Sequence, residues 1–423
     1  MAIRNQHVRF FLFFFVTFIV NNSYGMFPLN VFRPWDINLR PPRWHNKAWQ
    51  VTGYVETGFD AHAYNSEGDK VNPLEIWNTN QDALAMFEGF PSNTAINDFL
   101  DDVLLNPDDD GVRGHLKFTG DFDLKASAGI AARYHMPHNF NLGLFLPFYS
   151  MQLKDVTFQD LTANASLEDS IVKTELTSQF LARVQQFDPN LDLTGWKKTG
   201  LGDLALLAEW WRDFPQGKEY LKNVNLEGRF GFTFPTGVKK DENKILSIPF
   251  GYDGSAGVVF GGGINLMWSE CVRAGVDAQF LALFGNTRVR RIKVDPAQTD
   301  FLLFAQAEAH KEYGITQRFN LYAETYKWYG GLSIGAVYQY WKQGEDTLTL
   351  VTNQYSNEIA NSAESLQEWT MHQFIFTAKY DFQDVLSDTA LFKPHVFAFF
   401  KLPINGQRSL MASMLGLSIT LNF

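Results

Sequence analysis

The sequence predicts an all-β protein, built as a single transmembrane antiparallel β-barrel with long loops at one end and short turns at the other. Three observations predict this fold class. The first residues have the character of a secretory signal. Most of the remaining chain alternates between apolar and polar residues over stretches of about ten residues, the length that a transmembrane strand needs. The final stretch, "LGLSITLNF", has leucine or isoleucine at every second position and ends on phenylalanine.

Residues 1–25 are expected to be a signal peptide that is not part of the fold. The segment "MAIRNQHVR" has two arginines and no acidic residue, and the apolar run "FFLFFFVTFIV" and the small residues of "NNSYG" follow it. The apolar run is shorter than the roughly 20 residues of a membrane-spanning helix, although an N-terminal anchor is the alternative. Because no later segment is long and apolar enough for such a helix, we expect a location in the outer membrane of a Gram-negative-type bacterium.

Residues 26–48 are predicted to be a short N-terminal extension, and residues 49–423 the barrel. The extension, "FPLNVFRPWDINLRPPRWHNKA" from residue 27 on, is rich in proline, arginine and tryptophan. We favour a periplasmic tail, and a plug-like insert into the barrel mouth is the alternative.

About twelve strands are predicted from the alternation. The region 300–325 is too long for one strand, and "EYGITQ" within it is able to hide a turn, which would raise the number to fourteen. The expected strands cover residues 49–59, 114–134, 139–154, 200–212, 222–235, 251–268, 271–284, 300–325, 331–342, 368–382, 394–402 and 410–423.

The connections between these strands alternate in length, as they do in outer-membrane barrels with long extracellular loops and short periplasmic turns. "INGQRS" is a short connection in a long-loop position. The long connections are 60–113, 155–199, 236–250, 286–299 and 343–367. Tryptophans near strand ends predict an interfacial aromatic girdle, and they are Trp49, Trp210, Trp211, Trp268, Trp328, Trp341 and Trp369.

The C-terminal strand is predicted to close the barrel by pairing with the first strand, which removes both sheet edges. Its lipid face is expected to hold Met411, Leu415, Leu417, Ile419, Leu421 and Phe423, and its luminal face Ala412, Gly416, Ser418, Thr420 and Asn422. The pattern resembles the insertion signal of bacterial outer-membrane barrels. This resemblance assigns the signal to Leu417, Ile419, Leu421 and Phe423 and implies the barrel-assembly machinery as a partner.

Charged residues on the polar faces of the strands are the candidate lumen-lining residues. Mixed signs allow either ion pairs that fill the barrel or a water path whose charge sets ion selectivity, and the sequence leaves both open. These residues are Lys117, Asp121, Asp123, Lys125, Glu227, Arg229, Arg273, Asp277, Glu308, His310 and Lys379.

The composition argues against several classes of function. A formal net charge of −10 and a pI near 5.4 disfavour nucleic acid and anionic membrane surfaces as partners, because both need positive charge. The single cysteine, Cys271, excludes an internal disulfide and a thiolate metal cluster, and we interpret it as a small strand residue.

We expect no enzyme activity, no cofactor and no metal. The nine histidines are scattered, and His135 and His138 of "HMPH" fall in an expected turn. "NPDDDG" (106–111) is dense in acids but lacks the glutamate at position twelve of a calcium loop. A solvated loop is the favoured interpretation, and a weak divalent-cation site is the alternative.

Three motifs in a fixed order point to a family. "GLGDLALLAEWW" (200–211) is followed by "LEGRFGFTFPTG" (226–237) and "GYDGSAGVVFGGGINLMW" (251–268). This order resembles the outer-membrane transporters of the phenol-degradation type, relatives of the long-chain fatty-acid and aromatic-hydrocarbon channels. The resemblance covers about 70 residues. It implies passive uptake of hydrophobic small molecules, although the Asn-Pro-Ala motif of the fatty-acid channels' plug is missing from this sequence.

The prediction is therefore a bacterial outer-membrane channel or transporter for passive uptake of small solutes, including hydrophobic or aromatic ones. A surface structural or adhesion barrel, whose loops 60–113 and 155–199 bind a partner, is the alternative, and an outer-membrane hydrolase ranks last. The expected partners are outer-membrane lipids, the barrel-assembly machinery and small solutes. The sequence leaves the solute and the oligomeric state open.

Overall fold

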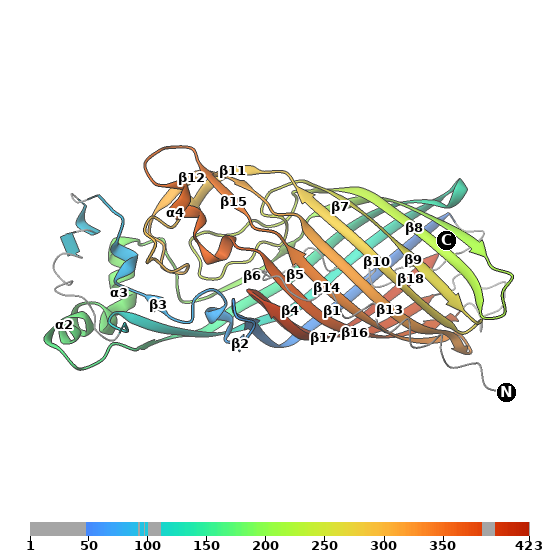
Figure 1. The fold of residues 1–423 in the computed structure, drawn as a ribbon, viewed down its shortest axis with the longest axis horizontal. Coiled ribbons are helices and arrows are strands. Elements are labelled where there is room, and N and C mark those ends of the chain that lie inside the picture. Colours follow the sequence, from blue (N-terminus) through green and yellow to red (C-terminus); the bar gives the residue numbers. More distant parts are fainter. Residues whose placement is uncertain (1–47, 92–93, 97, 100–110, 383–393, 423) are drawn as a thin grey trace, which may run out of the picture.

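The structure is a computed structural model that describes residues 48–91, 94–96, 98–99, 111–382 and 394–422 (Figure 1). The predicted signal peptide, almost all of the predicted N-terminal extension, and Phe423 lie outside these residues. Long tilted strands form one elongated body. Short turns join the strands at one end, the turn end, and long segments with helices and a small extra sheet lie at the other, the loop end (Figure 1).

Twelve strands close into an antiparallel barrel, which confirms the predicted fold class and strand number. Each strand pairs with its neighbours along the chain, and the first strand pairs with both the second and the last. The strands are β1 (Trp49–Tyr64), β4 (His115–Met136), β5 (Phe140–Asp160), β7 (Leu204–Pro215), β8 (Leu221–Phe234), β9 (Gly257–Trp268), β10 (Val272–Leu283), β13 (Thr316–Tyr329), β14 (Leu332–Gln343), β16 (Trp369–Asp381), β17 (His395–Gln407) and β18 (Ser409–Asn422).

The region 300–325 divides, as "EYGITQ" suggested, yet the barrel keeps twelve strands. Its first part is β12 (Gln306–Glu312), which pairs with β11 (Asn286–Arg291) and β15 (Thr347–Leu350) in a separate three-stranded sheet. Residues 313–315 then lead the chain into β13 of the barrel. The added strand therefore belongs to a peripheral sheet at the loop end (Figure 1).

The outer face of the barrel is apolar and exposed around the whole circumference. Because every strand alternates, its outward positions hold large hydrophobic residues while its inward positions are buried. A soluble protein rarely exposes such a continuous apolar surface, whereas a transmembrane barrel needs one. Members of this surface include Val55, Ile130, Leu142, Leu144, Phe148, Phe230, Phe260, Ile264, Val276, Phe319, Leu321, Ile334, Phe376, Leu415, Leu417 and Ile419.

The predicted aromatic girdle holds for part of the tryptophans. Trp49 and Trp268 are about half exposed at the turn end, and the ring of Trp49 packs against Tyr134 with centroids 4.9 Å apart. Trp341 and Trp369 instead lie buried at the loop end. Trp210 and Trp211 are half-buried, and the side chain of Trp328 lies outside the described atoms.

The first and last strands meet in a seam of thirteen paired residues. Gln50 donates a hydrogen bond to Asn422 at 3.0 Å, and the hydroxyls of Thr52 and Thr420 are 2.9 Å apart. These inward positions and the outward Leu415, Leu417 and Ile419 agree with the predicted faces of the last strand. Met411 differs from the prediction of a lipid-facing position. It is buried with Tyr64, Trp341 and Trp369, because this part of the strand lies beyond the apolar belt, at the loop end.

The loop end has its own hydrophobic core. The inward faces of β4 and β5 continue beyond the apolar belt and pack against α2 (Leu167–Glu175) and α3 (Phe180–Phe187). Ser166 begins α2 as an N-cap in a reciprocal capping box with Asp169. None of the described helices is long and apolar enough to cross a membrane. The remaining elements are β2 (Lys70–Val71), β3 (Gln81–Asp82), β6 (Trp196–Leu201), α4 (Asn357–Asn361) and the 3-10 turns Pro73–Glu75, Ala85–Phe87, Pro137–Asn139, Thr177–Gln179 and Glu364–Leu366.

Candidate functional site: a charged lumen and a pocket at the loop end

Asp277 is the centre of the first group of charges inside the barrel. It lies on β10, with one carboxylate oxygen 3.1 Å from Nη2 of Arg318 on β13 and the other 3.5 Å from Nη2 of Arg229 on β8. The side-chain amide of Asn320 donates to the same carboxylate at 3.0 Å, and Glu227 lies 3.7 Å from Arg229. Asp277 therefore compensates the charge of both guanidinium groups, and Glu227 is a second carboxylate beside Arg229.

Glu324 is the centre of a second group, on β13. Its carboxylate is 2.8 Å from Nζ of Lys379 on β16 and 3.4 Å from Nε of Arg273 on β10. The guanidinium of Arg273 also lies over the ring of Tyr326, 3.6 Å from its centroid. The two groups extend across neighbouring strands, so they form one charged stretch of the inner wall.

Two further ion pairs line the opposite part of the wall. Nε of Arg133 on β4 is 3.0 Å from Glu209 on β7, and Nζ of Lys401 on β17 is 2.6 Å from Glu56 on β1. The second pair spans β18, and Gly416 of that strand leaves room for the ring of Phe399, from which a Cβ atom would lie 2.1 Å. Each cation on this wall thus has a carboxylate partner from another strand.

The structure brings five of the predicted lumen residues together. Glu227, Arg229, Arg273, Asp277 and Lys379 all point inward and take part in the two groups above. Their companions were not identified from the sequence, although most occupy polar positions of alternating strands. These companions are Glu56, Arg133, Glu209, Arg318, Glu324 and Lys401.

Four other predicted lumen residues lie on the outer face of β4. Inward positions there belong to the buried Leu116, Phe118, Phe122 and Leu124, which pack in the core of the loop end. Above the membrane, the barrel interior is filled by protein, so the apolar face turns inward and the polar face meets water. The residues on that polar face are Lys117, which is 2.8 Å from Glu75, Asp123, which is 3.3 Å from Lys154, and the exposed Asp121 and Lys125.

Glu308 and His310 lie outside the barrel altogether. They belong to β12 of the three-stranded sheet, where Nδ1 of His310 is 2.9 Å from the hydroxyl of Thr287. Alternation alone does not distinguish a barrel strand from a strand of a peripheral sheet.

Asp203 joins the three motifs that carry the family resemblance. It lies at the break between β6 and β7, both of which pair with β5. Its carboxylate accepts hydrogen bonds from the backbone N–H groups of Gly237 at 2.7 Å and Tyr252 at 2.5 Å. A Cβ at Gly251 would lie 2.3 Å from that carboxylate, so the chain approaches as only glycine permits. Asp203 thereby anchors residues 235–256 to the break between the two strands.

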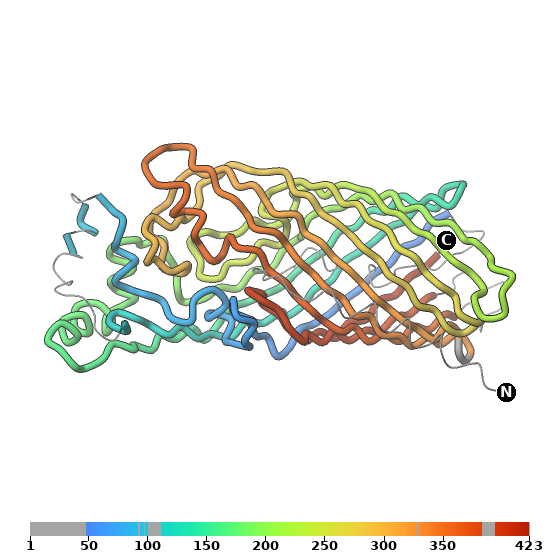
Figure 2. The backbone as a smooth tube through the Cα atoms, in the orientation of Figure 1, coloured from blue at the N-terminus to red at the C-terminus, as the bar shows by residue number. Residues whose placement is uncertain are grey.

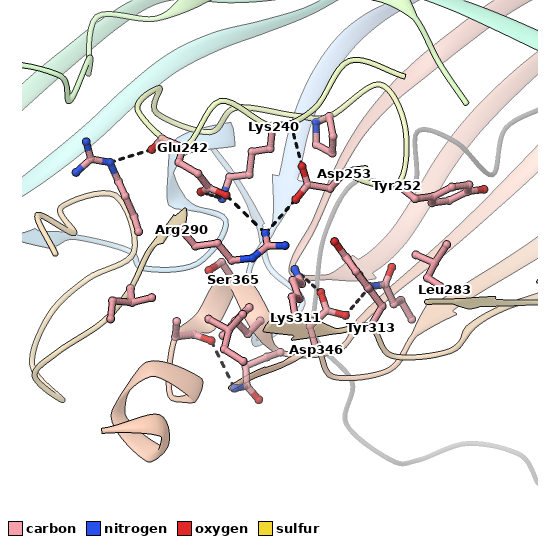
Figure 3. Close-up of a pocket in the computed structure, with 18 of the residues that line it drawn as sticks. Lys240, Glu242, Tyr252, Asp253, Leu283, Arg290, Lys311, Tyr313, Asp346 and Ser365 are labelled. Carbon is pink, nitrogen blue, oxygen red and sulfur yellow. Dashed lines mark hydrogen bonds and ion pairs between the residues drawn. The ribbon is translucent and has the colours of Figure 1, made fainter. Parts of the chain in front are cut away.

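A cavity of about 140 Å³ lies at the loop end (Figure 3). Three connections enclose it: residues 240–253 between β8 and β9, the segment around β11 and β12, and residues 343–369 with α4. Figure 3 shows Arg290 between Glu242 and Asp253, and Lys311 beside Asp346. These three connections join β8 to β9, β10 to β13 and β14 to β16, and Figure 2 shows their backbone at the loop end.

Arginines of β11 hold one wall of this cavity in place. Nη2 of Arg288 is 2.6 Å from Asp253, and Nη1 of Arg290 is 3.1 Å from the same carboxylate. Arg288 also contacts Glu242, whose carboxylate is 3.0 Å from Nζ of Lys240. Burial raises the pKa of Glu242, but the charges of Lys240, Arg288 and Arg290 outweigh burial, so the net pKa is below its ordinary value.

An ion pair closes the opposite side of the cavity. Nζ of Lys311 is 2.7 Å from Asp346, whose carboxylate also accepts hydrogen bonds from the backbone of Gly314 and the side chain of Gln343, both at 3.0 Å. Burial lowers the pKa of Lys311, but the charge of Asp346 raises it by more. The net pKa is therefore above its ordinary value, and Lys311 remains protonated. This pair fixes the segment between β12 and β13 against the start of β15.

The other motifs form no metal site among the residues that the structure describes. His135 lies at the end of β4 with Nδ1 2.5 Å from Asn141, and His138 occupies the turn with φ of 65°. Residues 106–110 of "NPDDDG" lie outside the described ranges. Cys271 is exposed in the turn before β10 and is not part of the strand that we predicted to begin with it.

No protein-family model and no curated protein sequence matches this chain. Solved structures do. An outer membrane channel from Pseudomonas putida F1 is 13% identical, with a TM-score of 0.48, over 91% of this chain and 100% of that one. The Pseudomonas putida toluene transporter TodX is 7% identical with a TM-score of 0.34 over 95% of each chain, and a Pseudomonas aeruginosa FadL homologue is 9% identical with a TM-score of 0.28 over 89% of each. The barrel fold of this chain is established by its own strand pairing.

Proposed function

We propose that this protein is an outer-membrane channel through which small solutes pass passively. One observation carries the proposal: a closed antiparallel barrel is apolar on its outside and lined by paired charges on its inside. Closure leaves no unpaired backbone edge in the lipid, and the apolar exterior supplies the surface that lipid chains contact.

The charged interior favours transport over a purely structural role. Placing ionised side chains inside a protein is costly, and an apolar core of the same shape would be at least as stable. A twelve-stranded barrel is also wider than the small barrels that side chains fill. Charges of both signs along the wall are the kind of lining that sets which ions and polar solutes enter.

We also propose that the protein is not an enzyme. Among the described inward-facing residues of the barrel, the charged groups named above are engaged in ion pairs between different strands. Such mutual neutralisation suits a lining, whereas a hydrolase needs a nucleophile next to a base at the rim. The hydrophobic or aromatic character of the solute rests on the motif resemblance alone.

Single-channel recording in a planar lipid bilayer tests this proposal. We expect the refolded chain to give a reproducible conductance step in salt. Asp277→Asn removes one negative charge from the wall. The reversal potential in a salt gradient should therefore shift in the direction that reports greater anion permeability. Asp121→Asn makes the same charge change on the outer face of β4 and should leave selectivity unchanged. A correctly folded barrel that carries neither ions nor solute would refute the channel.

A further inference from the structure

Lys293 is the starting point for a binding site in the cavity at the loop end. It follows β11, lines the cavity and is only 8% exposed. The other lining cations have carboxylate partners: Lys240 with Glu242, Arg290 with Asp253, Arg291 with Asp188, and Lys311 with Asp346. Among the residues that the structure describes, Lys293 has neither an ion pair nor a side-chain hydrogen bond.

Arg290 lines the same cavity and has one unsatisfied donor, which is enclosed by protein. Its Nη atoms bond Asp253 and Asn286, but its buried Nε has no hydrogen-bond partner within the described part of the chain. Buried charges and donors are normally paired, because leaving them unpaired costs free energy. Lys293, a buried lysine without a partner on the wall of this cavity, is therefore the mark of an anionic group that binds there.

Apart from the charged groups and the polar side chains of Thr316, Gln343, Ser365 and Gln367, the lining is apolar and aromatic. Tyr252, Tyr313 and Trp369 contribute aromatic rings. The hydroxyl of Tyr313 donates a hydrogen bond to Asn286, and the indole N–H of Trp369 donates one to Gln343. Aliphatic side chains complete the walls, namely Ile248, Leu283, Ile292, Leu303, Leu348 and Leu366. A cavity of about 140 Å³ is close in size to the apolar cavity of about 150 Å³ that accommodates benzene in another protein.

We propose that this cavity binds a small aromatic monocarboxylate. The ring would occupy the apolar walls, and the carboxylate would accept a hydrogen bond from Lys293, with Arg290 adding positive charge to the same lining. As a docking site for a solute that then crosses the barrel, this assignment rests on the proposed channel function. As a binding site, it is testable without transport.

Benzoate titrated into the full chain in detergent micelles tests the site, with isothermal calorimetry as the readout and Trp369 as a fluorescence reporter. We expect saturable binding of benzoate and much weaker binding of benzamide, which has the same ring but no charge. Lys293→Met should weaken benzoate binding by about tenfold to a hundredfold, because it removes a charge-assisted hydrogen bond. Lys293→Arg, which keeps the charge, should retain most of the affinity.

Lys244→Met is the matched control. Lys244 is a half-exposed lysine of a different connection, between β8 and β9; it pairs with Asp192 at 3.5 Å and does not line the cavity. It should bind benzoate like the wild type. The Lys293→Met chain should also unfold at a higher temperature without ligand, because it no longer buries an uncompensated charge. This gain shows that weaker binding is not due to misfolding.

Two outcomes would overturn the assignment. One is a folded wild-type chain that shows no saturable benzoate binding up to millimolar concentration. The other is Lys293→Met binding benzoate as tightly as the wild type. Conductance is measured separately on the same preparation, so a conducting barrel without benzoate binding refutes the site alone, and benzoate binding by a silent barrel supports the site while refuting the channel.

Discussion

The carboxylate of Asp203 accepts hydrogen bonds from the backbone N–H groups of Gly237 and Tyr252, which lie 34 and 49 residues further along the chain. One side chain thus ties a break in the barrel wall to both ends of the connection between β8 and β9. Tyr252 also lines the cavity at the loop end. A substitution at Asp203 should therefore alter the position of Tyr252 in the cavity wall.

Asp203→Asn is expected to loosen residues 235–256. The amide offers one acceptor oxygen where the carboxylate offers two, so one backbone N–H loses its partner, at a cost of about 1–3 kcal/mol. Trypsin should then cleave faster after Lys239 or Lys240, and quantitative mass spectrometry of the fragments measures the rate. Asp155→Asn, at a residue whose side chain is 71% exposed, is the control and should not alter cleavage. Equal cleavage rates in both variants would show that Asp203 does not hold this connection.

The buried pair between Lys401 and Glu56 should be far more sensitive to a single than to a double substitution. Lys401→Met leaves a buried carboxylate without its cation, which should lower the free energy of unfolding by about 3–5 kcal/mol. The double variant Lys401→Met with Glu56→Gln should regain most of this loss. Denaturant unfolding in micelles, followed by tryptophan fluorescence, gives both values, and additive losses would argue against coupling between the two residues.

Lys198 should titrate close to neutral pH. Its ammonium donates to the carbonyl oxygens of Lys239 and Ile248 at 2.9 and 3.0 Å, and burial lowers its pKa to about 8. Because the unfolded chain holds this proton up to a pKa near 10.5, the contribution of Lys198 to stability should rise as pH increases from about 8 to about 10.5. Carbon-13 resonances of the lysine Cε atoms report the titration, with Lys198→Gln identifying the signal. A midpoint above 10 would contradict the burial argument.

Acid should release the wall of the cavity that Glu242 supports. The pKa of Glu242 lies below its ordinary value of 4.5, so its stabilising effect is complete above pH 4.5 and is lost as pH falls through the lower, folded-state pKa. Amide hydrogen exchange of residues 240–253 should therefore accelerate in that acidic range. In Glu242→Gln the same amides should exchange faster at neutral pH and show a smaller acid step. An unchanged acid step would assign the effect to other carboxylates.

Alternation along the chain was enough to predict the barrel, because side chains of a β-strand alternate with a period of two residues between the two faces of the barrel wall. Eleven of the twelve barrel strands fall close to their predicted ranges, whereas the predicted strand 300–325 overlaps β13 only in its second part. What alternation does not reveal is the height of a residue relative to the membrane. Lys117 and Asp121 have the same pattern as Arg229, yet they lie where the inside of the barrel is protein core and the outside is water.

The charged companions inside the barrel depend on contacts between strands that the sequence does not specify. The inward orientation of Arg318 and Glu324 follows from the start of β13 at Thr316, which the sequence does not define. Lys293 gave no signal at all, because a lysine after "VRRI" in a long connection is most often solvated. Its significance comes from burial without a partner, a property of packing between three connections.

The seam between β1 and β18 joins residues as far apart as Gln50 and Asn422, a separation of 372 residues, whereas the other pairings of the barrel join strands that follow one another along the chain. Pairings between consecutive strands are local and are able to form early, but the barrel closes only when the last strand pairs with the first. Until then the sheet has two free edges, and either one can pair with another copy of the chain. A weakened seam should therefore appear first as slow assembly and intermolecular aggregation, before the finished barrel shows any loss of stability.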